Sequence, residues 1–167
     1  MRLAFKNIHD ENVGRWGGVG LPGRGPRPVN RPPPVIGRAF LQDWKPDDRV
    51  LLAVTMPGGG SNTAREAFAR IVAVAAIDPT PLPSAKVLNP DIDPGQWTWA
   101  VRFTGLWATK KLPYFAIAEG RLRAKTMGQR GMMFWLTEEL GLEELEAWLA
   151  RQQPLQPLPI WQPSNGS

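Results

Sequence analysis

The chain has 167 residues, 43% of them hydrophobic, so it is long enough for one domain with a single core, and no apolar run reaches the ~18 residues of a membrane span. Cysteine is absent and His9 is the one histidine, which excludes disulfides, thiolate metal sites and cysteine nucleophiles. A net charge of +5 and a pI near 10.1 point to a polyanionic partner. We therefore expect no enzyme, cofactor, metal or membrane association, and, without a signal-peptide pattern, a cytoplasmic location.

The first third of the chain contains two predicted strands separated by a long loop. Residues 3–8 alternate partly in polarity, which predicts a strand. Residues 16–37 are rich in glycine and proline, contain arginines but no acidic residue, and are predicted to be neither helix nor sheet. Such a loop is usually functional, with a basic linker as the alternative. Residues 38–44 predict a short helix, and residues 49–55 predict a strand buried on both faces.

The middle of the chain predicts two more strands. A glycine-rich link at residues 56–62 leads to an ambiguous segment, whose second half, IVAVAAI, is β-branched and predicts a strand from Phe68 to Ile77. Prolines make residues 79–94 a surface connection. Residues 96–107 alternate clearly, which predicts a strand with Trp99 in the core. Trp97, at the entrance of this strand, either caps the core or lines a pocket.

The C-terminal part predicts less regular structure before a final helix. Residues 110–113 form a predicted basic turn, and residues 121–127 alternate basic and apolar side chains, which suggests a short exposed strand. Thr137 is predicted to cap a helix whose leucines form one apolar stripe covering the sheet. The predicted domain spans residues 1–151. The proline-rich tail, residues 152–167, either packs against this domain or binds a partner.

Several motifs, taken in order, resemble those of the EVE and YTH domains, which belong to the PUA-like group of small β-barrel nucleic-acid readers. The matching segments are Phe5-Lys6, Trp16-Gly17-Gly18-Val19, residues 71–75, residues 100–103, Leu112-Pro113 and residues 127–131 followed by Thr137-Glu138-Glu139. The resemblance implies an α/β (α+β) fold with a strongly bent mixed β-sheet or open β-barrel of about five or six strands and peripheral helices. It also implies that a modified base is received in an aromatic cage.

Physical reasoning supports the same kind of site. A nucleobase stacked on an aromatic ring gains about 1 to 3 kcal/mol, and arginines bind the flanking phosphates. Because a methyl group alone discriminates weakly, polar groups must also contact the base edge. The predicted base-binding residues are Trp16, Trp97, Thr55 and Asn7, and the predicted phosphate-binding residues are Arg24, Arg27, Arg31 and Arg130. Trp16 is the first candidate platform, which requires an open face on its ring.

We therefore expect a module that binds nucleic acid and recognises a modified, in particular a methylated, base. The sequence leaves open whether the partner is DNA or RNA, and whether a separately encoded nuclease or other protein acts with it. One alternative is a protein-interaction module, such as a phage or mobile-element factor, that uses the proline-rich loop and tail. Another is a metal-dependent nuclease, for which Asp91 and Asp93 are the closest acidic pair outside turns and the final helix.

Overall fold

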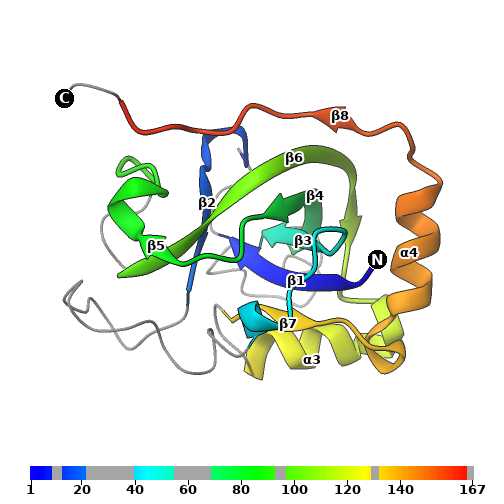
Figure 1. Ribbon diagram of the computed structural model, residues 1–167. Coiled ribbons are helices and arrows are strands. Elements are labelled where there is room, and N and C mark those ends of the chain that lie inside the picture. The colour runs from blue at the N-terminus through cyan, green and yellow to red at the C-terminus, as the bar shows by residue number, and fades with distance from the viewer. Residues whose placement is uncertain (9–12, 22–39, 55–68, 93–96, 129–131, 165–167) are drawn as a thin grey trace.

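The chain forms a curled β-sheet with helices around it. The computed structural model describes residues 1–8, 13–21, 40–54, 69–92, 97–128 and 132–164. Their six-stranded sheet, in the order β2-β6-β4-β3-β1-β7, curls into an open half-barrel, and the short strands β5 and β8 pair with β6 outside this path (Figure 1). The strands are β1 (Leu3–Ile8), β2 (Gly18–Gly20), β3 (Arg49–Val54), β4 (Arg70–Ile77), β5 (Leu82–Pro83), β6 (Trp99–Pro113), β7 (Phe134–Trp135) and β8 (Gln156–Pro157). This confirms the predicted bent mixed sheet with peripheral helices.

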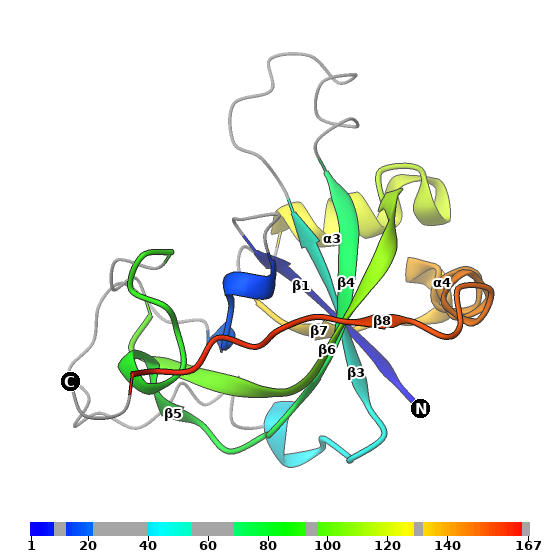
Figure 2. The ribbon, with the colours of Figure 1, turned by 90° about the horizontal axis from the view of Figure 1, so that it is seen from above.

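Short helices connect or cover the strands. They are the 3₁₀ turns η1 (Val13–Arg15), η2 (Ser84–Lys86), η3 (Ile117–Gly120) and η4 (Glu138–Leu140) and the α-helices α3 (Arg121–Gly128) and α4 (Leu142–Ala150). Residues 40–42 are helical as well, in agreement with the predicted helix at 38–44. Strands β2 and β5 lie at one end of the molecule and α4 at the other in both views (Figures 1 and 2). None of the helices in the described ranges is long and apolar enough to cross a membrane.

The sheet separates two apolar layers, because successive side chains of a strand point to opposite faces. On β1, Leu3 and Phe5 belong to the layer that also contains Leu122 of α3 and Leu145 of α4. Ala4 and Ile8 belong to the other layer. The members of that second layer that matter below are Trp16, Trp44, Val50, Leu52, Val101 and Phe103, with Trp97 and Trp99 packed against it. Whether a residue of β1 has an odd or an even number therefore decides which layer its side chain enters.

Strand β6 is longer than the sequence predicts. The strand expected at 96–107 is confirmed from Trp99 onwards, but residues 110–113, predicted as a turn, continue β6 and pair with β4 as far as Arg70 opposite Pro113. The β4–β6 pairing shifts register at two points, and such irregularities bend a sheet, which favours the curl. Tertiary pairing keeps the two lysines of this segment extended although their own pattern is typical of a turn.

The predicted exposed strand at 121–127 is wrong, because these residues form helix α3. Arginine, leucine, alanine, lysine and methionine all favour helices, and the two buried side chains of the segment, Leu122 and Thr126, are four residues apart, the spacing of one helical face. The Thr126 hydroxyl donates to the Leu122 carbonyl oxygen at 2.8 Å. The alternation of basic and apolar residues was therefore a poorer guide than helix propensity.

The predicted final helix exists but begins later than expected. Thr137 precedes η4 and makes no capping hydrogen bond through its side chain, and α4 starts only after Gly141. Gly141 has a φ of +89°, and a Cβ there would lie 2.5 Å from Cγ2 of Ile117, so both the conformation and the space favour glycine. Leu145 and Leu149 are buried, as the apolar stripe predicts.

The loop predicted at residues 16–37 also begins later, because Gly18–Gly20 form β2 and pair with β6. Residues 22–37 of that loop lie outside the described residues.

The tail after α4 is extended and follows β6, as the red segment of Figures 1 and 2 shows. The Leu158 amide donates to the Leu106 carbonyl oxygen at 2.8 Å, and the Trp161 amide donates to the Trp16 carbonyl oxygen at 3.1 Å. The tail therefore packs on the sheet in this region.

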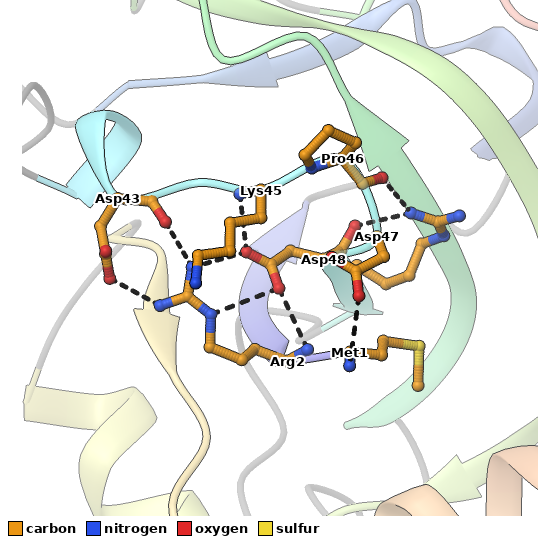
Figure 3. A network of polar contacts seen from close by, with 8 residues as sticks. Met1, Arg2, Asp43, Lys45, Pro46, Asp47 and Asp48 are labelled. Carbon is orange, nitrogen blue, oxygen red and sulfur yellow. Dashed lines mark hydrogen bonds and ion pairs between the residues drawn. The ribbon is translucent and has the colours of Figure 1, made fainter.

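A polar network joins the start of β1 to the turn before β3 (Figure 3). The Arg2 guanidinium lies between Asp43 and Asp48, with Nη1 2.6 Å from Oδ2 of Asp43 and Nη2 2.7 Å from Oδ2 of Asp48. The Lys45 amide also donates to Asp48, at 2.8 Å. The guanidinium carbon of Arg2 lies 4.1 Å from the ring centroid of Trp135, so one arginine joins the starts of β1 and β3 to the neighbouring β7.

Candidate functional site

Lys6 is a charged residue in the middle of the buried strand β1. It pairs with Leu52 of β3 in register, and its side chain is only 2% exposed. Because Ala4 and Ile8 have the same parity, Lys6 enters the layer inside the curl rather than the layer under the helices. A lysine rarely lies this deep without a functional or structural reason, since its ammonium group loses its hydration.

The ring of Trp97 lies against this amine. Nζ of Lys6 is 4.5 Å from the ring centroid of Trp97, a distance at which the negative face of an indole attracts a cation. Trp97 precedes the first residue of β6 by two positions and is partly exposed, so the pair connects the interior to the surface. Its backbone is held by β5 and η2, since the Ser84 hydroxyl donates to the Trp97 carbonyl oxygen and the Ser84 amide donates to that of Thr98.

Strand β2 provides the backbone against which the Trp97 ring packs. A Cβ at Gly20 would lie 2.3 Å from Cγ of Trp97, so only a residue without a side chain lets the indole approach this closely. The next residue, Leu21, donates its amide hydrogen to the Trp99 carbonyl oxygen at 2.8 Å. The chain position from which the arginine-rich loop continues is therefore attached to the same end of β6 as Trp97.

The electrostatics of this site depend on the burial of Lys6. Burial lowers the pKa of the Lys6 amine from 10.5 to about 7, because the charged form loses its solvation. Near neutral pH the group therefore exchanges between a three-donor ammonium and a neutral amine. The buried amine contacts the Trp97 ring from inside the half-barrel, while the partly exposed part of the indole offers an aromatic surface to a planar guest.

Trp16 is not the open platform that the sequence suggested. Its side chain is 5% exposed and belongs to the core inside the curl. No acceptor for its Nε1 hydrogen is found within the described ranges. A large aromatic side chain after a turn has the same sequence pattern whether it lines a pocket or closes a core. The expectation of an exposed Trp16 face is therefore corrected.

Asn7 lies on the opposite face of β1 from Lys6 and Trp97. Its Oδ1 accepts a hydrogen bond from the Tyr114 hydroxyl at 3.4 Å, in the layer under the helices. Since neighbouring residues of a strand point to opposite faces, Asn7 and Trp97 do not line one slot. The structure thus separates two residues that the sequence-based hypothesis placed in the same site.

The other predicted site residues lie outside the described residues. They are Thr55, Arg24, Arg27, Arg31 and Arg130. The structure does describe residues near them in the sequence. Val54 ends β3, the Leu21 amide donates a hydrogen bond to the Trp99 carbonyl oxygen, and Gly128 ends α3.

Comparison with known proteins does not assign this chain to a family. No known family model matches the chain, and no curated protein matches its sequence. Among the residues with described positions, no three histidine or acidic side chains gather closely enough to hold a metal ion. The curled sheet and its buried aromatic clusters are compatible with a binding domain.

Lys6 belongs to the Phe5-Lys6 motif, but it is not among the site residues predicted from the sequence. The signal that could have identified it is a single lysine whose neighbours on the same strand face, Ala4 and Ile8, are apolar, in a strand whose pairing partner, residues 49–54, is entirely apolar after its first residue. Such a pattern indicates that the amine is either at a sheet edge or buried. Only the parallel pairing of β1 with β3 decides that it is buried.

Proposed function

We propose that the chain is a non-enzymatic nucleic-acid-binding module that receives a modified, in particular a methylated, base against Trp97. The observation that carries the proposal is the position of this indole. It is partly exposed, it contacts a buried amine, and it lies at the end of the half-barrel from which the arginine-rich loop continues. An aromatic surface, a fixed orientation of that surface and positive charge in the adjoining segment of the sequence are three features that such a module needs.

Each feature contributes a different part of the recognition. Stacking on the indole contributes about 1 to 3 kcal/mol and does not depend strongly on the base. The Lys6 amine lies over the Trp97 ring and helps to hold the indole in its orientation through a cation–π contact. Arg24, Arg27 and Arg31 follow Leu21 within ten residues of sequence and supply charge for phosphates, a contribution that decreases steeply with salt.

The resemblance to EVE and YTH domains supports the same proposal from the sequence side. In this chain the tryptophan of the Trp16-Gly17-Gly18-Val19 motif is buried and leads directly into β2. We therefore assign Trp16 to the core and the platform to Trp97. The PUA-like assignment itself remains part of the proposal.

The proposal is tested by fluorescence anisotropy with labelled DNA and RNA oligonucleotides, each with and without a methylated base, at low and high salt. We expect the unaltered chain to prefer a methylated oligonucleotide and to bind it more weakly at high salt. Trp97→Ala is expected to lower this affinity by roughly five- to a hundredfold, the equivalent of one lost stacking contact. Lys6→Met is expected to weaken binding less than Trp97→Ala does, because it removes a contact that orients the indole but keeps the stacking surface.

A matched control is Trp148→Ala, because Trp148 is also a partly exposed tryptophan but lies on α4, at the other end of the molecule. The affinity of the Trp148→Ala variant for the methylated oligonucleotide should equal that of the unaltered chain. The proposal is wrong if Trp97→Ala keeps its fold and binds as tightly as the control. It is also wrong if no oligonucleotide is retained while a protein partner binds at high salt, which would favour the protein-interaction alternative.

A further inference from the structure

A hollow of about 450 Å³ opens between η3 and α3, away from the Trp97 site. Its lining residues are Phe115, Glu119, Gly120, Arg123, Ala124 and Met127. Phe115 follows the last residue of β6 by two positions, whereas Trp97 precedes the first by two, so the two sites lie at opposite ends of this long strand (Figure 1). The size of the hollow is in the range of small-molecule sites.

Arg123 is the cation that lines this hollow. Its guanidinium carbon lies 4.8 Å from the ring centroid of Phe115, which in turn stacks on Tyr114 at 5.4 Å with an angle of 20° between the rings. Within the described part of the chain, the buried Nε of Arg123 has no acceptor and its guanidinium has no carboxylate partner. A flat cation is thus held in place by an aromatic ring rather than by an ion pair.

The neighbouring arginine of α3 is different. Nε of Arg121 donates to the Ala118 carbonyl oxygen at 3.2 Å, and Nη2 of Arg121 lies 3.5 Å from Oε2 of Glu119, so the acid on the rim already has a cation beside it. Arg121 does not line the hollow. The two arginines therefore carry the same charge and lie on the same helix, but their surroundings differ.

The walls of the hollow are shaped by an unusual turn and by exposed apolar surface. Ala118, Glu119 and Gly120 have φ values of +51°, +56° and +84°, a left-handed path that carries the chain from β6 into α3 around the hollow. Met127 on the opposite wall is 57% exposed. A thioether is polarisable and adapts its shape, so it suits contact with a flat ring.

We propose that this hollow binds a nucleotide unit, with the base on the plane of Arg123 beside Met127 and the phosphate on the guanidinium edge. Guanidinium groups stack on planar rings and bind phosphate oxygens through two parallel hydrogen bonds, so one arginine can serve both parts of a nucleotide. A simple inorganic anion would leave the apolar walls without contact. A neutral apolar ligand would leave the cation without a partner. The site is independent of Trp97, and its nucleotide can be free or part of a strand.

The test uses isothermal titration of the full chain with adenosine monophosphate, adenosine, inorganic phosphate, acetate and a short single-stranded oligonucleotide. Adenosine monophosphate should bind more tightly than adenosine, phosphate or acetate, because only it contacts both the cation and the walls. Arg123→Gln should weaken this binding roughly tenfold, as expected for the loss of a charged contact of about 1.5 kcal/mol. Arg121→Gln, the matched control with the same charge change on the same helix, should leave it unchanged.

A second variant, Met127→Glu, places a negative charge on an exposed position of the wall and should also weaken binding, which keeps the test valid if Arg123→Gln unfolds. If adenosine monophosphate binds Arg123→Gln and Met127→Glu as well as the unaltered chain, the inference is overturned. Loss of binding in Trp97→Ala alone would place the nucleotide in the Trp97 site and overturn it too. Equal binding by the oligonucleotide and the mononucleotide would support a single-nucleotide site, and tighter binding by the oligonucleotide would support a strand residue as the occupant.

Discussion

Lys6 brings an amine into the interior of the half-barrel, next to the aromatic ring that the proposed function requires. In an unfolded chain its pKa is near 10.5, and burial lowers the folded value to about 7. Between these two pH values the unfolded chain binds a proton that the folded chain does not, so the free energy of unfolding increases as the pH rises from about 7 to about 10.5. Below that window the full cost of burying the charge is present.

We therefore expect Lys6→Met to be more stable than the unaltered chain at pH 6 to 7, by roughly 1 to 3 kcal/mol. The difference should shrink as the pH rises towards 10. Urea denaturation at several pH values measures it, with Lys110→Met, an exposed lysine of β6, as the control for loss of charge alone. If the curves of Lys6→Met and the unaltered chain stay parallel over this range, Lys6 is not buried as a titrating amine.

Trp16 is a core residue whose Nε1 hydrogen has no acceptor among the described residues, so its substitution is expected to change stability. Trp16→Ala should lower the free energy of unfolding by about 3 to 5 kcal/mol, as expected for a large cavity. Trp16→Phe should cost much less, since it keeps most of the ring and removes Nε1. Thermal denaturation with Trp148→Ala for comparison tests this. A nearly unchanged midpoint in Trp16→Ala would restore the first hypothesis, in which this ring is an open platform.

At the scale of elements, the turn before β3 depends on a nearly buried carboxylate. The side chain of Asp48 is 1% exposed. Burial alone would raise the pKa of the Asp48 carboxyl, but hydrogen bonds from Arg2 and from the Lys45 and Arg2 amides outweigh it and lower the pKa below its ordinary value of 3.8. The carboxylate therefore contributes stability that is complete above pH 3.8 and is lost as the pH falls through the lowered value.

Asp48→Asn should thus lower the free energy of unfolding by about 1 to 3 kcal/mol at neutral pH, because Arg2 and two amides lose their charged acceptor. At a pH below the folded pKa of Asp48, the variant and the unaltered chain should become nearly equal. Asp47→Asn is a suitable control, since Asp47 is 70% exposed and pairs with the N-terminal amine in Figure 3. Equal losses in the two variants at neutral pH would contradict the assignment of the network to Asp48.

The elements that the sequence predicted well are those with strong apolar patterns of their own. Residues 3–8, 49–54 and 70–77 are strands as expected, since few other structures bury such runs. The segments at 110–113 and 121–127 were predicted wrongly because their patterns are weak. In the first, pairing with β4 overrides a turn-like composition, and in the second, helix propensity and packing of Leu122 override an apparent alternation.

At the scale of the whole molecule, β6 is the element that joins the two candidate sites. It pairs with β2 and β5 near Trp97, with β4 in the middle of the sheet, and with β8 of the tail. The tail reaches the Trp16 backbone through Trp161, so residues far apart in sequence close the same end of the half-barrel. The proline-rich tail thus packs on the sheet in this structure, and its Trp161 reaches the end of the half-barrel that contains β2, against which Trp97 also packs.

The amino-acid sequence by itself determined the fold class, the main strands and the presence of aromatic and basic residues, because composition and local periodicity act over a few residues at a time. Only the tertiary structure decided that Trp16 is buried, that Lys6 faces Trp97, and that Asn7 faces Tyr114 instead. Those outcomes depend on which strands pair and which face of each strand turns inwards. Contacts between segments separated by tens of residues set both, and no local pattern in the chain records them.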